Sequence, residues 1–170
     1  MRCSVFIAIS LDGFIARSDG AIDWLSIVER EREDHGFAAF FESIDTVVMG
    51  RKTWQIALGF DPWPYAKKRV VVLSHEPRHS SHGEEFWSGD AAALLDTLNG
   101  SRRIYADGGT VIAQLLAADR IDDLTISIVP ILLGAGTPLS PAIGRDIRLR
   151  LTKHRTFESG LVQLQYAIAR

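Results

Sequence analysis

The chain has 170 residues, of which 46% are hydrophobic and 24% charged, and its formal net charge is −2. This length predicts a single domain over residues 1–170, with the composition of an ordinary globular protein. One cysteine, Cys3, excludes an intramolecular disulfide and any Cys-x-x-Cys motif. The near-neutral charge gives no reason to expect nucleic acid or a membrane as a partner. We expect a cytoplasmic protein, because no leader-like or long apolar segment is visible.

Strand and helix patterns alternate along the first three-quarters of the chain. Short runs rich in β-branched residues predict buried parallel strands, and apolar residues at helical spacing predict the helices between them. The expected strands are 5–9, 45–49, 69–74, 103–106 and 124–129, and the expected helices are 29–43, 51–58, 91–98 and 110–118. Asp90 is a residue type that caps the start of a helix.

The last quarter has a different pattern. Residues 130–141 are rich in Gly and Pro, and two alternating strands at 148–155 and 161–169 are joined by Glu158-Ser159-Gly160, which predicts a hairpin. We therefore predict an α/β fold with three layers, α/β/α. Its central sheet would be mixed and mostly parallel, with an antiparallel C-terminal hairpin.

Three segments place special residues where ligands of open α/β sheets bind, beyond the carboxyl ends of the strands. In Met49-Gly50-Arg51-Lys52-Thr53 a helix begins with two cations and a hydroxyl, which fits either a bound phosphate group or a solvated helix that begins with basic residues. Ser74-His75 follows another strand, where a simple loop start is the alternative. Asp107-Gly108-Gly109-Thr110 joins a strand to a helix through two glycines, which allow either close ligand approach or a tight turn.

The near-neutral net charge conceals a basic segment. Residues 51–78 carry six Lys or Arg against two Asp or Glu, a local charge of +4, whereas the remainder carries 13 against 19. Two of the three candidate phosphate sites lie within this segment. A small phosphorylated ligand is therefore compatible with the overall charge.

Several short segments, in this order, resemble the dihydrofolate reductase-like fold. The closer resemblance is to the reductase domain of the bifunctional riboflavin-biosynthesis deaminase-reductases and their stand-alone relatives. The likeness covers nearly the whole chain and is carried by residues 9–16, 23–25, 49–54, 72–74, 107–110 and 129–139. Each segment alone is moderately specific, but their order and spacing together are strong.

This resemblance implies an NADPH-dependent reductase of a small heterocyclic substrate, similar to 5-amino-6-(5-phosphoribosylamino)uracil reductase. A dihydrofolate reductase and a non-catalytic NADP-binding module remain alternatives. The basic segment favours NADP over NAD. The cofactor-binding residues implied by the resemblance are Ala8, Ile9, Ile15, Gly50, Arg51, Lys52, Thr53, Ser74, His75, Gly108, Gly109, Thr110 and Val111.

For the substrate, the resemblance implies Asp12 as the catalytic and substrate-binding acid. A basic residue often follows two positions later in the family, but here that residue is Phe14. Phe14, Trp24 and Trp63 would offer an aromatic wall to a flat heterocycle. Asp12-Gly13 could equally form only a turn. Glu29, near the position of the folate-binding carboxylate, fits a solvated run of charges better than a binding site.

We expect no metal site. Three histidines at 75, 79 and 82 lie close together, but they lack a matching scaffold of carboxylates or thiolates. The resemblance also implies a homodimer formed through the late strands.

Overall fold

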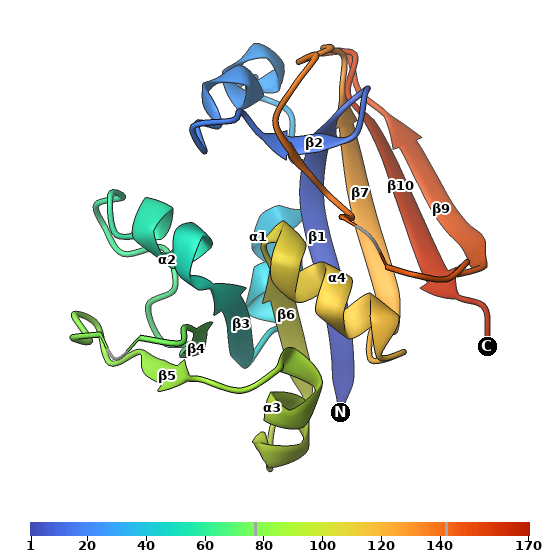
Figure 1. Cartoon of the computed structure of the whole chain (residues 1–170). Helices are drawn as coiled ribbons and strands as arrows, with labels where there is room; N and C mark the ends of the chain where they lie inside the picture. Colours follow the sequence, from blue (N-terminus) through green and yellow to red (C-terminus); the bar gives the residue numbers. More distant parts are fainter. Residues whose placement is uncertain (77, 142) are drawn as a thin grey trace.

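The computed structural model describes residues 1–76, 78–141 and 143–170. Figure 1 labels most of the elements found in these residues. In chain order they are β1 (Arg2–Ser10), β2 (Phe14–Ala16), the 3-10 helix η1 (Asp23–Val28), α1 (Phe37–Glu42), β3 (Thr46–Gly50), α2 (Arg51–Ala57), β4 (Arg69–Leu73), β5 (Glu85–Trp87), α3 (Ala91–Thr97), β6 (Arg103–Asp107), α4 (Gly109–Ala117), β7 (Asp123–Val129), β8 (Thr137–Pro138), β9 (Leu149–Thr156) and β10 (Val162–Ile168).

The strands form an eight-stranded sheet in the order β5-β4-β3-β6-β1-β7-β10-β9. Neighbouring strands from β5 to β7 run parallel, whereas β10 is antiparallel to both β7 and β9. The predicted mixed, mostly parallel sheet with a C-terminal hairpin is confirmed. A separate pair, β2 with β8, lies near one end of β1 and β7 (Figure 1).

Helices cover both faces of the sheet because its strands are apolar on both sides. Val48 of β3 packs in one core with residues of α3 and α4. The adjacent Val47 and Met49 pack in a second core with α1 and with Trp54 of α2. A third, smaller cluster joins η1 to the end of β7. This alternation produces the three predicted layers.

The helix expected within 29–43 is much shorter, since α1 has six residues. Gly36 precedes it in a left-handed conformation, with φ of 81°, and ends any helix that could approach from the charged run before it. Glu33 in that run accepts a hydrogen bond from the backbone N–H of Ser159, at 2.8 Å. A tertiary contact thus holds the segment as a loop. By contrast, Asp90 caps α3 as predicted, accepting a bond from the N–H of Ala93.

The single cysteine, Cys3, is buried. Burial together with Asp122 and Asp123 raises the pKa of its thiol to about 12, so the thiol is protonated at neutral pH.

Across the described ranges of the chain, no helix is both long and apolar enough to cross a membrane.

Glu84 is a buried carboxylate that fixes the entry to the edge strand β5. Its Oε1 accepts a hydrogen bond from Trp54 Nε1 of α2, at 2.9 Å. Its Oε2 accepts bonds from Ser80 Oγ and from the backbone N–H groups of Ser81 and His82, at 2.7 to 2.9 Å. Burial alone would raise the pKa of Glu84, but these bonds lower it to about 2. The charged carboxylate therefore connects α2 to the sheet edge.

We expect Glu84→Gln to lower the free energy of unfolding at pH 7 by roughly 3 kcal/mol, the value of a pKa lowered from 4.5 to about 2. Because the folded-state pKa is depressed, this stability is present above pH 4.5 and disappears as pH falls toward 2. Thermal unfolding of the unmodified protein and of Glu84→Gln at pH 7 and pH 3 measures this difference in stability. Glu85→Gln, which breaks only an exposed pair with Arg69, is the control. A stability difference that does not shrink at pH 3 would contradict this role.

Candidate functional site

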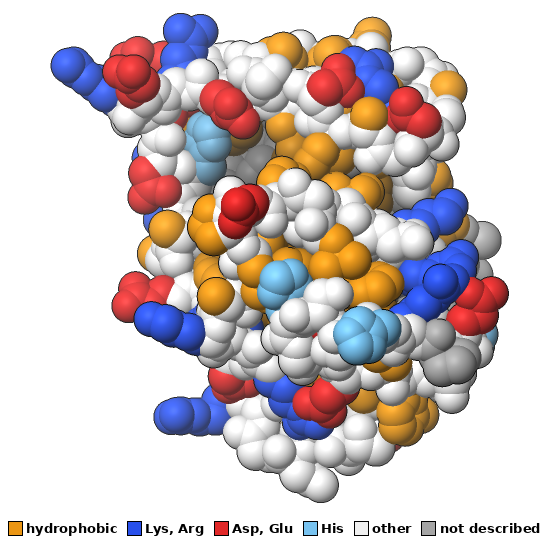
Figure 2. All heavy atoms as spheres, turned by 90° about the vertical axis from the view of Figure 1, so that its left-hand side faces the viewer, with side chains coloured by type: hydrophobic (Ala, Val, Ile, Leu, Met, Phe, Trp, Pro, Cys, Tyr) orange, Lys and Arg blue, Asp and Glu red, His pale blue; other side chains and the backbone are white. Residues whose placement is uncertain are grey.

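Two adjoining pockets lie at the carboxyl ends of the parallel strands. The first, the glycine pocket, has a volume of about 520 Å³ and is lined by Gly50, Gly108 and Gly109 among others. The second, the aromatic pocket, has a volume of about 590 Å³, and its walls include Phe37, Tyr65 and other rings. In Figure 2 a hollow with many hydrophobic atoms crosses this face of the molecule. The position is the one expected for ligands of an open α/β sheet.

The glycine pocket collects eleven of the thirteen residues predicted to bind the cofactor. Ala8 lines the aromatic pocket instead. Ile9 lines neither pocket, and its side chain packs against the core on the α3 and α4 face. The residues brought together in the glycine pocket are Ile15, Gly50, Arg51, Lys52, Thr53, Ser74, His75, Gly108, Gly109, Thr110 and Val111.

Close backbone packing explains why glycines stand after β6. Gly108 has φ of 89°, and a Cβ there would lie 2.5 Å from Thr53 Oγ1 of α2. A Cβ at Gly109 would lie 2.8 Å from the carbonyl oxygen of Pro138 in β8. Any side chain at either position would collide with a neighbouring segment. The turn from β6 to α4 therefore presents bare backbone to the glycine pocket.

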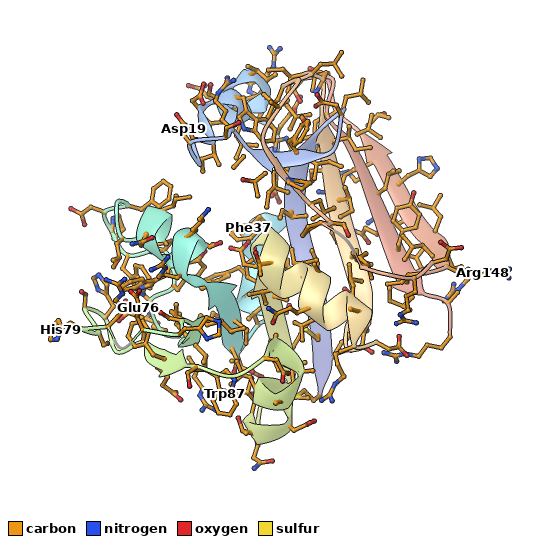
Figure 3. The ribbon with its side chains drawn as sticks, viewed as in Figure 1. Asp19, Phe37, Glu76, His79, Trp87 and Arg148 are labelled. Carbon is orange, nitrogen blue, oxygen red and sulfur yellow. The ribbon has the colours of Figure 1, made fainter. Side chains whose placement is uncertain are left out.

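Basic side chains lie at the outer part of the glycine pocket. Arg51 Nη1 is 3.3 Å from Glu76 Oε2, and Arg78 also pairs with Glu76. Ser74, almost fully buried, donates its hydroxyl to the carbonyl oxygen of Glu76 at 2.8 Å. Figure 3 shows Glu76 beyond the end of β4. An anionic group entering here would meet the Arg51 guanidinium, whose one ion-pair partner among the described residues is the exposed carboxylate of Glu76, and could displace that carboxylate.

The aromatic pocket contains a partly buried acid, Asp107, that the sequence argument treated only as part of a turn. Tyr65 Oη donates a hydrogen bond to Asp107 Oδ2 at 3.2 Å, and both residues line the pocket. Burial raises the pKa of Asp107, although hydrogen bonds from Tyr65 and the Gly108 N–H act in the opposite direction. Burial and Asp107 also raise the pKa of Tyr65. The pair therefore holds a proton in a mostly apolar cavity.

The two pockets share part of their walls, namely Ile15, Ala16, Thr53, Ile56 and Gly108. Asp107, one residue before Gly108, lies where they meet. A ligand extending along the glycine pocket would thus reach the aromatic pocket beside this acid.

The model of the RibD C-terminal domain family matches residues 3–163. The chain belongs to the RibD C-terminal domain family. It is 34% identical over 170 residues to the uncharacterized protein YwjB of Bacillus subtilis, covering 97% of each chain. A crystal structure from Shewanella sp. PV-4, a protein provisionally assigned to riboflavin biosynthesis, is 37% identical, covers all of both chains and superposes with a TM-score of 0.92.

A dihydrofolate reductase from Enterococcus faecalis, in complex with NADP(H), has only 17% identity but a TM-score of 0.68, covering 99% of this chain and 97% of that one. This likeness shows the fold alone. It confirms that this RibD C-terminal domain has the dihydrofolate reductase-like fold predicted from its sequence.

In this RibD-type domain, Asp12 does not reach either pocket. Its exposed carboxylate accepts hydrogen bonds from Ser10 Oγ at 2.6 Å and from the backbone N–H groups of Leu133 and Gly134, at 3.1 and 2.7 Å. The bond from Ser10 is the main cause of its lowered pKa. Asp12 is thus charged and pins the segment before β8, which roofs the β6–α4 turn. Its contacts in the structure are thus those of a residue that positions this segment, and its predicted catalytic role stays a prediction.

The three predicted aromatic contacts also lie outside the pocket walls. Trp24 is buried with Val28 in the small core under η1. Trp63 stacks on His82 with ring centroids 4.5 Å apart and packs edge-on against Tyr65, behind the pocket wall. Phe14 lies in β2, paired with β8. The rings that do line the pocket belong to residues 6, 37, 60, 65 and 105. Glu29, assigned from the sequence to a solvated run, also lines it.

We expect Asp12→Ala to lower the melting temperature and to speed amide hydrogen exchange in residues 131–139, because the backbone donors of Leu133 and Gly134 lose their acceptor. Hydrogen-exchange mass spectrometry measures this. Asp19→Ala, which removes a single local bond to Ala21, is the matched control. Unchanged exchange accompanied by lost turnover would instead support the catalytic role predicted from the sequence.

Proposed function

We propose that the protein is an NADPH-dependent reductase of a small flat heterocycle, with the cofactor in the glycine pocket and the substrate in the aromatic pocket. The observation that carries this proposal is the junction of the two pockets beside Asp107. Membership of the RibD C-terminal domain family supports it.

The residues of the glycine pocket fit a phosphorylated dinucleotide. The glycines at 108 and 109 leave a bare backbone cradle that a Cβ would fill, next to the start of the nine-residue helix α4. Arg51, Lys52 and Ser74 would hold a 2′-phosphate, and Ile15 lies where the pockets join. When bound, NADPH supplies a hydride to an electrophilic atom of the substrate.

Asp107 is the residue that we propose as the proton donor. Because burial raises its pKa, the carboxyl group keeps its proton to a higher pH than an exposed aspartate does. Its proton would go to the substrate atom next to the one that receives the hydride. One hydride and one proton then add across one double bond, and solvent returns a proton to Asp107. Tyr65 orients the carboxyl group through the 3.2 Å bond.

The buried acid also favours an enzyme over a non-catalytic cofactor-binding module. Asp107 has its side-chain partner Tyr65 in the same cavity, and among the described residues that line this cavity none is Lys or Arg. A buried acid without a counter-ion costs stability, and such costs concentrate at sites of chemistry. A module that only binds NADPH has no need of it.

We expect Arg51→Ala to weaken NADPH binding by about 1.5–3 kcal/mol, or roughly 10- to 100-fold, because a charged hydrogen bond to phosphate is lost. NADH affinity should change little. Titration of each nucleotide against tryptophan fluorescence tests this, with the exposed Arg102, at the opposite end of the sheet, replaced by Ala as the control. Equal losses for both nucleotides would show that Arg51 does not bind a 2′-phosphate. Absence of NADPH binding to the unmodified protein would refute the proposed function.

We expect Asp107→Asn to reduce turnover with NADPH about 100-fold or more, with the heterocycle pterin as the first acceptor assayed, because the proton donor is lost. The same variant should be more stable than the unmodified protein at pH 8. Since the folded-state pKa of Asp107 is raised, the stability that it contributes is lost as pH rises through that pKa, whereas Asn carries no charge.

Melting temperatures of Asp107→Asn and of the unmodified protein between pH 4 and pH 8 test the predicted gain in stability. The advantage of the Asn variant should grow with pH, and Asp96→Asn, at an exposed site, should show no such trend. Unchanged turnover in Asp107→Asn would remove this residue from the proposed chemistry.

A further inference from the structure

Charge is divided sharply between the two pockets. Arg51 and Lys52 line the glycine pocket. The aromatic pocket has two acidic residues on its walls, Glu29 and Asp107, and among the described residues that line it none is Lys or Arg. Its mouth is apolar, because Phe37 and Phe60 are 42% and 51% exposed there. Figure 3 shows Phe37 beside β1, on the side of α2.

From this division we infer that the substrate carries neither a phosphate nor a carboxylate group. The inference rests on the proposed function in assigning the aromatic pocket to the substrate. An anionic group moved from water into this cavity would lose its hydration without gaining a Lys or Arg partner, and the carboxylate of Glu29 would repel it. The pocket therefore suits an uncharged, flat molecule that presents a carbonyl or ring nitrogen to Asp107.

This substrate class differs from both of those that the sequence resemblance implies. The phosphoribosylaminouracil of the riboflavin pathway ends in a phosphate, and dihydrofolate ends in a glutamate with two carboxylates. Each would need basic side chains at the substrate end of the cleft. The position two residues after Asp12, which is often basic in the family resembled, is Phe14 here and lies in β2, away from the pocket wall.

A second cluster of cations, apart from Arg51 and Lys52, lies behind an aromatic wall. A groove of about 400 Å³ on the other side of α1 is lined by four basic residues, Arg2, Arg103, Lys153 and Arg155. It shares only Phe6 and His35 with the aromatic pocket. Phe6 packs against Phe37 and Phe40, with ring centroids 5.4 and 5.0 Å apart. His35 Nε2 lies 3.3 Å from the carboxylate of Glu33. These contacts separate the basic groove from the substrate.

A matched pair of fluorescent heterocycles tests the inference on the full chain. Pterin and pterin-6-carboxylate share one ring system and differ by one carboxylate. Binding of each is measured by its fluorescence anisotropy, with and without NADP⁺. We expect pterin to bind about tenfold or more tightly than its carboxylate, a difference of about 1.4 kcal/mol. Equal or tighter binding of the carboxylate, or no binding of pterin, would overturn the inference.

Charge variants locate the effect. Glu29→Lys should narrow the affinity difference between pterin and pterin-6-carboxylate several-fold, because it adds a cation to the pocket wall. Phe37→Lys, at an exposed position, adds the same charge if Glu29→Lys fails to fold. Glu31→Lys makes the identical change at an exposed position outside the pocket and should have no effect. Loss of carboxylate binding in Lys153→Glu would show instead that the anion reaches the basic groove, which contradicts the inference.

The nucleotide and pterin titrations distinguish a failure of this inference from a failure of the proposed function. If NADPH binds but the two pterins bind equally, the reductase proposal stands and the substrate class is wrong. If NADPH fails to bind while pterin alone still binds more tightly than its carboxylate, the pocket's selection against anions stands and the reductase proposal is wrong.

Discussion

The close approach of the β6–α4 turn to α2 is the constraint on which the site depends. Gly108 has φ of 89°, which other residues rarely adopt, and a Cβ there would lie 2.5 Å from Thr53 Oγ1, so this close approach favours glycine. Because β3 and β6 are parallel neighbours, their carboxyl ends emerge together, and α2 and α4 begin side by side. That contact divides one continuous cleft into a glycine pocket and an aromatic pocket, with Asp107 at the junction.

A second layer of contacts holds this turn from above. The pair β2–β8 lies over Gly109, whose missing side chain leaves room for the carbonyl of Pro138. Asp12 fixes the segment that leads into β8 through two backbone N–H groups. Residues more than 100 positions apart in sequence thereby roof the place where a pyrophosphate would bind. A charged side chain that contacts no ligand can control ligand affinity in this way.

The parallel sheet, its helices and the glycine pocket could be predicted because they depend on local patterns. A buried strand followed by a glycine, such as Gly50 or Gly108, indicates a strand end that turns into a helix, and this pattern can be read without knowledge of the rest of the fold. The Pro-rich loop with Phe60 and Tyr65 could be expected at the rim of a cleft, but the rest of the aromatic pocket could not be predicted, because walls such as Phe6 and Tyr105 come from residues scattered along the chain. Tyr65 lies in a loop with no periodic pattern, and only the fold brings it within 3.2 Å of Asp107. The shortened α1 shows the same limit, since Glu33 is held by the distant Ser159.

Two aspartates at strand ends show how surroundings assign roles to identical side chains. Asp12 is exposed and accepts three hydrogen bonds, which lower its pKa and keep it charged. Asp107 has a hydroxyl partner in an apolar cavity, and burial raises its pKa. A fixed charge suits the first to bind backbone donors, whereas a group that retains a proton suits the second to give one up. The sequence resemblance favoured Asp12 as the acid, but the physical environment favours Asp107, because a carboxyl group in a largely apolar cavity keeps its proton more readily than an exposed one.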